Sequence, residues 1–212
     1  MTTELFPSKA PGVPLMVLVG MEGEGDAVVR AARAVTGADF SLALVSGMSW
    51  EDDLTPWPAP ALGGGQAPFG GRADAFLEEL TGRLPGIVAE LGAAPIWVGL
   101  AGYSLAGLFA LYAITRTDAF ARAASVSGSL WYPEFVEYAE KHPAQAGRVY
   151  LSVGDKECRA KLPVMRSVEE NTRRMEALYR RQGVPVKFEL NPGGHFRDPE
   201  ARTGRAIAWL VE

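Results

Sequence analysis

The sequence predicts an α/β fold, with a mostly parallel sheet of about six strands and helices on both faces. Its short apolar runs lack apolar/polar alternation, which is typical of strands that are covered on both faces. Helical stretches fill the gaps between these runs, and alternating strands and helices form right-handed βαβ units. The 212 residues contain no repeat and no dividing linker. We therefore expect one domain, residues 1–212, large enough to bury a substantial core.

The predicted strands are runs rich in Val, Ile and Leu, and the predicted helices lie between them. The strands are residues 15–19, 40–45, 96–100, 123–126, 149–153 and 186–190. The helices are residues 26–35, 74–91, 104–116, 133–141, 163–182 and 201–211. Residues 105–114 are apolar on nearly every side, which predicts a buried helix, whereas residues 162–178 follow the amphipathic period. Gly183 then ends that helix.

The longest stretch without a predicted element is residues 46–72, which is rich in Pro and Gly. Long irregular stretches in compact domains are more often functional than idle. In open parallel sheets, ligands bind beyond the carboxyl ends of the strands. The residues that directly follow each predicted strand are therefore the first candidates for chemistry.

Composition excludes several classes of function. The 21 basic residues against 25 acidic ones give a net charge of −4, without the basic face that a nucleic-acid partner requires. No apolar run of about 20 residues could span a membrane, and the start has no secretory pattern, so a cytoplasmic protein is expected. A lone Cys158 allows neither an internal disulfide nor a thiolate metal site. Asp52 and Asp53 lack further ligands and indicate a solvated turn, so no metal or other cofactor is expected.

A candidate nucleophile follows the strand at residues 96–100. The segment Gly102-Tyr103-Ser104-Leu105-Ala106 nearly matches G-x-S-x-G, with Ala106 at the final glycine. Such a nucleophile sits on a sharp, strained turn between a strand and a helix, and small neighbours let the chain pass. The helix start would also aim the Leu105 backbone N–H at a developing oxyanion. The alternative is a glycine-rich turn with an incidental serine.

A candidate base and two candidate acids follow the last strands. His195 comes after the strand at 186–190 in a Gly-rich loop, whereas His142, the other of the two histidines, ends a polar helix. A carboxylate after the strand at 149–153 could hold the imidazole and stabilise its charged form. Asp155 and Glu157 both qualify, and Glu157 is favoured for its reach. The order serine, acid, histidine after successive strands is typical of α/β-hydrolases.

These segments resemble the putative esterase family of the α/β-hydrolase superfamily. The likeness rests on Gly102–Tyr112, Ser125–Tyr132, Gly154–Glu157 and Gly194–Phe196, and it spans roughly residues 14–210. That family includes enterochelin esterases, S-formylglutathione hydrolases, feruloyl esterases and mycolyltransferases. The resemblance implies an acid three residues after the glycine, which supports Glu157. It also implies that the Met21 backbone N–H is the second oxyanion donor.

The chain departs from this family in length. Family members usually have two antiparallel strands before the strand at 15–19 and often a lid, whereas this chain starts almost at that strand. A minimal lid, or none, and a comparatively open site are therefore expected. Trp131 and Tyr132 follow the strand at 123–126, and Trp50 and Trp57 lie in the long irregular stretch. All four are candidates for the walls of a substrate pocket, although such aromatics often belong to the edge of a core.

The sequence thus predicts a serine hydrolase that cleaves a small-molecule carboxylic ester without a cofactor. Ser104 would attack, His195 would move the proton, and Glu157 would orient His195. Acyl transfer and thioester cleavage would use the same three residues. From a different class, a binding module with a hydrolase-like fold is the alternative. Neither the physiological ester nor the oligomeric state can be inferred from the sequence.

Overall fold

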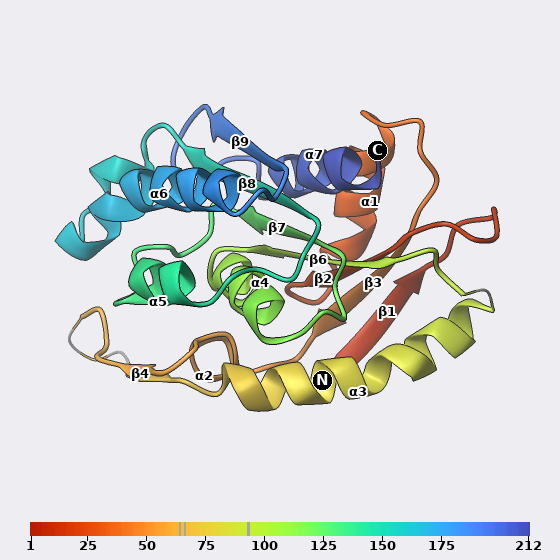
Figure 1. Ribbon diagram of the computed structural model, residues 1–212, viewed down its shortest axis with the longest axis horizontal. Helices are drawn as coiled ribbons and strands as arrows, with labels where there is room; N and C mark the ends of the chain where they lie inside the picture. The colour runs from red at the N-terminus through yellow and green to blue at the C-terminus, as the bar shows by residue number, and fades with distance from the viewer. Residues whose placement is uncertain (64, 66, 93) are drawn as a thin grey trace.

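The computed structural model describes residues 1–63, 65, 67–92 and 94–212. Within them lies a seven-stranded sheet of order β1-β3-β2-β6-β7-β8-β9 (Figure 1). All neighbours are parallel except β1 and β3, which pair antiparallel. The strands are β1 (Thr2–Phe6), β2 (Leu15–Val19), β3 (Ser41–Ser46), β6 (Val98–Tyr103), β7 (Arg122–Val126), β8 (Arg148–Gly154) and β9 (Val186–Asn191). The predicted fold class is confirmed.

Helices cover both faces of this sheet (Figure 1). The longer ones are α1 (Gly25–Arg33), α3 (Ala73–Leu91), α4 (Leu105–Arg116), α5 (Phe135–Lys141), α6 (Val168–Arg181) and α7 (Pro199–Val211). Helices α1 and α7 pack together on one face, and α3, α4, α5 and α6 contribute to the core on the other. None of the helices in the described residues is long and apolar enough to cross a membrane.

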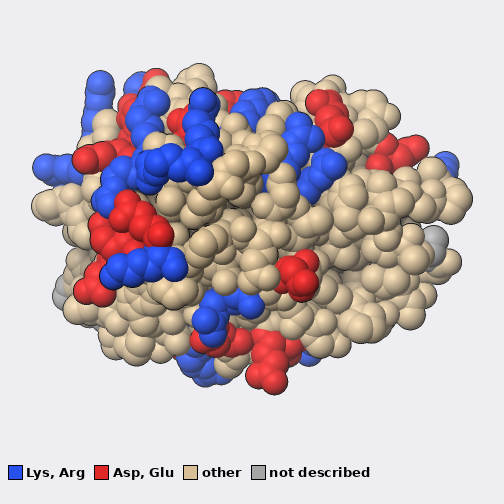
Figure 2. All heavy atoms as spheres, in the orientation of Figure 1, with Lys and Arg blue, Asp and Glu red and all other residues tan. Residues whose placement is uncertain are grey.

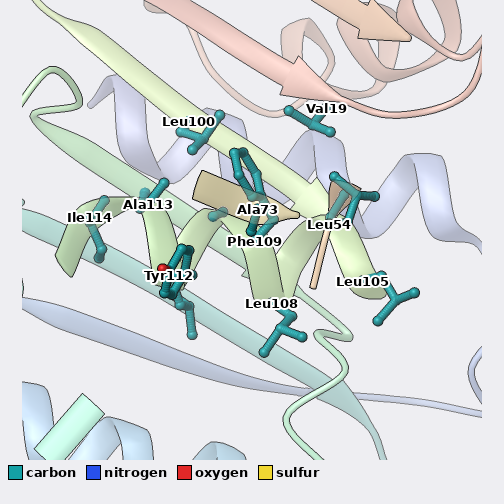
Figure 3. Close-up of a cluster of buried hydrophobic side chains, with 14 of the residues drawn as sticks. Val19, Leu54, Ala73, Leu100, Leu105, Leu108, Phe109, Tyr112, Ala113 and Ile114 are labelled. Carbon is teal, nitrogen blue, oxygen red and sulfur yellow. The ribbon is translucent and has the colours of Figure 1, made fainter. Parts of the chain in front are cut away.

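The two faces of the sheet each build a hydrophobic core, and β2 contributes to both. Leu15, Val17 and Val19 point into the core with α4, while Met16 and Leu18 point into the core with α1 and α7. All five are at most 2% exposed, which explains their unbroken apolar run. Every residue from Leu105 to Ile114 is buried in α4, because the helix lies between the sheet and other elements (Figure 3). The predicted buried helix is therefore confirmed.

Strand β1 is an element that the sequence reading did not include. Its five residues, T-T-E-L-F, range from exposed to half-buried and pair with β3 at the edge of the sheet. An edge strand needs no continuous apolar run. The expectation that the chain starts almost at β2 was therefore wrong, although only one antiparallel strand precedes β2.

The stretch at 46–72 is also more regular than expected. It contains the short helix α2 (Trp50–Asp53) and a small ladder between β4 (Pro58–Ala59) and β5 (Phe69–Gly70). The fully buried Thr55 holds it together, because its hydroxyl donates to the Glu51 carbonyl at 2.8 Å and accepts the Gly71 N–H at 3.1 Å. The rest of this stretch is irregular, as predicted.

Two boundaries near the strand ends differ from prediction. The strand expected at 96–100 lies at Val98–Tyr103, because Ile96 is exposed and Gly102 still pairs with both Val19 and Ser125. The helix expected from residue 163 begins at Val168, after two 3-10 turns at Glu157–Arg159 and Pro163–Ser167. The segment between β8 and α6 is therefore not part of the helix, and it lies beyond the carboxyl end of β8.

Candidate active site

Ser104 occupies a strained turn between β6 and α4. Its backbone has φ 58° and ψ −123°, a conformation that non-glycine residues rarely adopt and that typically costs about 1–3 kcal/mol. A side chain at Gly102 would put its Cβ 2.3 Å from the Ala106 carbonyl group, so this position requires glycine. Ala106 is fully buried against the bare Cα of Gly102. The turn thus accommodates the departure from G-x-S-x-G.

His195 lies between Ser104 and Glu157. Its Nε2 is 3.0 Å from the Ser104 Oγ, and its Nδ1 is 2.8 Å from the Glu157 Oε2. An ionised carboxylate can only accept, so Nδ1 carries the proton in the neutral imidazole and Nε2 accepts the Ser104 hydroxyl proton. The three side chains come from the ends of β6, β8 and β9, 91 and 38 residues apart along the chain. This arrangement can move a proton from a hydroxyl to an imidazole.

Glu157, and not Asp155, is the carboxylate that contacts His195. Its Oε1 also accepts the Gly154 N–H at 2.7 Å, and its side chain is only 4% exposed. Burial alone would raise the pKa of the Glu157 carboxyl, but the hydrogen bond and charge interaction with His195 outweigh it and lower the pKa below its ordinary value. Asp155 instead accepts the Gly193 N–H at 2.7 Å and so supports the loop that carries His195.

A buried arginine that the sequence reading missed links these loops. Arg202 is 1% exposed, and its Nη2 donates to the Pro192 carbonyl at 2.9 Å and to the Gly194 carbonyl at 3.1 Å. Its Nη1 lies 3.1 Å from the Ser127 Oγ and 3.4 Å from the Glu157 Oε1. The guanidinium therefore compensates the carboxylate charge and fixes the backbone just before His195.

One signal in the sequence could have identified Arg202. It stands four and eight residues before Ala206 and Leu210, which are buried on α7, and so falls on the apolar stripe of an amphipathic helix. A charged residue in such a stripe is buried with its partners. Tyr103 adds to the support, because its hydroxyl donates to the His195 carbonyl at 2.5 Å. Burial raises the pKa of Tyr103, which keeps this donor protonated.

A cavity of about 980 Å³ opens over Ser104 and His195. Trp131 lines it as expected, whereas Tyr132 and Trp57 are not among its lining residues. The Tyr132 hydroxyl donates to the Trp57 carbonyl at 2.5 Å, and the Trp57 Nε1–H donates to the Pro133 carbonyl at 3.1 Å. These two aromatic residues therefore join the 46–72 stretch to the loop after β7 instead of facing the cavity. The further apolar side chains of the cavity are Trp50, Leu62, Ala67, Phe69, Leu105, Ala160, Leu162, Met165, Val168 and Phe196.

The two predicted oxyanion donors differ in their surroundings. The Leu105 N–H begins α4 beside Ser104, and no hydrogen bond among the described residues uses it. The Met21 N–H donates to the Glu24 Oε2 at 3.0 Å, and Met21 is not among the described residues that line the cavity. The predicted donor at Met21 is thus occupied by a carboxylate, whose pKa burial raises. Sequence reasoning also missed Ser129, a buried residue whose Oγ is 3.4 Å from the Ser104 Oγ.

The described residues contain no group of three or more His, Cys, Asp and Glu side chains that could hold a metal ion. Asp52 and Asp53 instead accept hydrogen bonds from Ser49 at the start of α2, from its hydroxyl and its N–H, each at 2.8 Å. These contacts tie Ser49 to the short helix that follows it.

The fold, and the chain order of Ser104, Glu157 and His195 after β6, β8 and β9, are those of the α/β-hydrolase class. Comparison with known families narrows this class. The chain belongs to the family described as Putative esterase, which it matches over residues 5–199. It is 30% identical over 139 residues to the uncharacterized protein YbbA of Bacillus subtilis, a match that covers 62% of this chain but only 55% of that relative.

Solved structures share the fold at lower identity. An IroE-like serine hydrolase from Shewanella oneidensis superimposes with a TM-score of 0.81 and 16% identity, covering 99% of this chain and 75% of that one. An enterochelin esterase from Shigella flexneri superimposes with a TM-score of 0.72 and 18% identity, covering 99% of this chain and 54% of that one. A siderophore hydrolase, EstB from Aspergillus nidulans, superimposes with a TM-score of 0.70 and 18% identity, covering 95% of this chain and 83% of that one.

Proposed function

We propose that residues 1–212 form one α/β-hydrolase domain that cleaves carboxylic esters through an acyl-enzyme. The observation that supports this best is the continuous line of hydrogen bonds from Glu157 through His195 to Ser104, with the serine on a strained turn. A strained residue costs free energy and persists only where the surrounding fold holds it, and such residues cluster at active sites. Membership of an esterase family agrees with the same reaction.

In this mechanism, the Ser104 Oγ attacks the acyl carbonyl carbon while the His195 Nε2 takes the hydroxyl proton. The tetrahedral intermediate collapses, the C–O bond to the alcohol breaks, and His195 passes its proton to the leaving oxygen. A water molecule then attacks the acyl-Ser104 ester with His195 as the base, which releases the acid and restores the serine. Glu157 stabilises the imidazolium in both halves of the reaction.

The oxyanion of both tetrahedral intermediates would face the free Leu105 N–H. Such a donor is typically worth about 3–4 kcal/mol of transition-state stabilisation. The Met21 N–H is the second proposed donor, and the Glu24 carboxylate has to leave it before an oxyanion can bind. Trp131 would contact the apolar part of the substrate from the cavity wall.

Replacement of Ser104 by alanine tests the proposal. With 4-nitrophenyl butyrate as substrate, Ser104→Ala should lower kcat by several orders of magnitude, because loss of the nucleophile in a serine hydrolase typically costs about 10⁶-fold. The matched control is Ser8→Ala, which removes a serine hydroxyl from the segment before β2 that does not line the cavity, and which should keep the parent rate. A fluorophosphonate should label the parent and the control but not Ser104→Ala.

Equal rates in Ser104→Ala and the parent would refute the assignment. Parent protein that neither turns over esters nor takes the label would indicate a binding module instead. Added alcohols distinguish the related reactions: an acyltransferase would form a new ester at the expense of free acid, whereas a hydrolase would release the acid.

A further inference from the structure

The cavity over Ser104 and His195 has one basic wall. Three basic residues line this wall: Lys156, Arg159 and Lys161. All three belong to the segment between β8 and α6 that contains the two 3-10 turns. The Arg166 Nε donates to the Ala160 carbonyl at 2.9 Å, which holds this segment in place. The three basic residues thus belong to one short folded segment beside the cavity.

Within the described part of the chain, the three basic side chains of this wall lie outside every ion pair. None of the ion pairs among the described residues includes Lys156, Arg159 or Lys161. The neighbouring helix α6 differs, because its basic side chains lie among acidic ones on the face shown in Figure 2. Arg173 and Arg180, for example, pair with Glu169 at 3.0 Å and Glu176 at 2.6 Å. Other basic residues among the described ones, such as Lys9, Lys141 and Arg181, also form no ion pair, but they do not line the cavity. What distinguishes Lys156, Arg159 and Lys161 is that all three face the same cavity.

The acidic residues of the cavity do not neutralise this wall. Glu51 and Glu157 are the acidic side chains among the described lining residues. Glu157 is engaged by His195, the Gly154 N–H and Arg202. That leaves one acidic side chain, Glu51, against three basic ones, in a chain whose overall charge is −4. The charged side chains among the described lining residues are thus mainly basic, whereas the chain as a whole carries a net negative charge.

The other walls of the cavity are apolar. Trp50 and Phe69 come from the 46–72 stretch, and Trp131 follows β7. Met165 comes from the 3-10 turn before α6, and Val168 is the first residue of α6. A volume of about 980 Å³ is enough for a ligand with two chemically different parts. The nucleophile lies where such a ligand would have its ester bond.

We propose that the substrate is an ester with an apolar acyl or aryl part and a carboxylate, or a similar anionic group, several bonds from the scissile carbonyl. The anion would contact Lys156, Arg159 and Lys161, while the apolar part would contact the tryptophan side of the cavity. The inference rests on the proposed esterase function and adds the substrate class. Since the three cations are exposed to solvent, each adds modestly, and together about a tenfold preference in kcat/KM is expected at low salt.

Two pairs of matched esters test this preference, each pair differing only by carboxylate against primary amide. The first pair, 4-nitrophenyl hydrogen adipate and its amide, carries the anion on the acyl side. The second, 4-(carboxymethyl)phenyl butyrate and its amide, carries it on the alcohol side. The pair with the larger ratio of carboxylate to amide kcat/KM identifies the side that meets the basic wall, and this ratio should fall toward 1 in 0.5 M NaCl.

A charge-matched pair of variants tests the residues. Replacing Lys156, Arg159 and Lys161 together by glutamine should abolish the carboxylate preference. Replacing three basic residues outside the cavity, Lys9, Lys141 and Arg181, by glutamine removes the same net charge and should preserve it. Equal rates within both ester pairs in the parent, or a preference that survives in the first variant, would overturn the substrate class and leave esterase activity intact. No turnover of any of the four esters would overturn the esterase function and this inference together.

Discussion

Replacement of Arg202 by methionine should destabilise the protein strongly, because it removes a buried charge with five polar contacts. Methionine keeps most of the apolar stem but leaves Glu157 without its cationic neighbour. It also leaves the carbonyls of Pro192 and Gly194 without the guanidinium donors that they accept at 2.9 and 3.1 Å. Removing one partner of a buried ion pair typically costs about 3–5 kcal/mol, a large share of the roughly 5–15 kcal/mol that stabilises most domains.

Urea unfolding measures this cost through the free energy of unfolding extrapolated to water. The matched control is Arg205→Met on the same helix, whose arginine side chain is 37% exposed and pairs with Glu189 at 2.9 Å. That loss should be about 1 kcal/mol or less, since solvent screens the pair. Arg202→Lys should lie between the two, because one ammonium cannot reach all of the acceptors that the planar guanidinium spans.

The activity of the folded variants separates positioning from stability. If Arg202 holds the loop of His195, Arg202→Met should lower kcat more than it raises KM at a temperature where the variant is fully folded, and Arg202→Lys should restore part of kcat. An Arg202→Met protein within about 0.5 kcal/mol of the parent, the range of an ordinary surface substitution, would refute the reasoning about the buried charge.

Three further predictions concern the turn and the acid. Gly102→Ala should unfold at clearly lower urea concentration and lose activity, since its Cβ would collide with the Ala106 carbonyl. The control is Gly82→Ala in α3, where a Cβ meets open space, and its free energy of unfolding in urea should rise by roughly 1 kcal/mol. Ser104→Gly should be more stable than Ser104→Ala by about 1 kcal/mol in the same assay, because glycine relieves the positive φ, and the reverse order would argue against strain. The folded-state pKa of Glu157 lies below its ordinary value of 4.5, so the ionised carboxylate stabilises the folded protein above that pH. This stabilisation is lost as the pH falls through the folded-state pKa. Glu157→Gln should therefore flatten the pH dependence of the unfolding free energy measured below about pH 4.5.

The parallel part of the fold could be predicted from the sequence because most of its strands are buried on both faces, although the edge strand β9 is only partly buried. Continuous runs such as Leu15–Val19 have no other simple explanation in a chain of this size. Strand β1 gave no such signal, since Thr2–Phe6 has one neighbour in the sheet and is partly exposed. Edge strands depend on their pairing partner more than on their own composition.

The reacting side chains could be predicted because they directly follow strands, and parallel strands bring their carboxyl ends together. Ser104, Glu157 and His195 meet at one edge of the sheet for that reason. The pocket aromatics could be assigned in this way only in part, because Trp131 and Tyr132 both follow β7 but only Trp131 lines the cavity. Whether Trp57 faces a cavity or another loop depends on how the 46–72 stretch folds over the sheet, and no local pattern encodes that contact.

The short first strand has a consequence for the behaviour of the chain outside its native state. Strand β3 is buried along its whole length, and β1 occupies the hydrogen-bonding edge that β3 would otherwise present to solvent. In a variant that lacks Thr2–Phe6, the edge of β3 would expose unpaired N–H and C=O groups on a strand with apolar side chains. Such an edge is a template for intermolecular β-pairing and aggregation. By covering the edge of β3, the five residues of β1 therefore protect the chain from self-association.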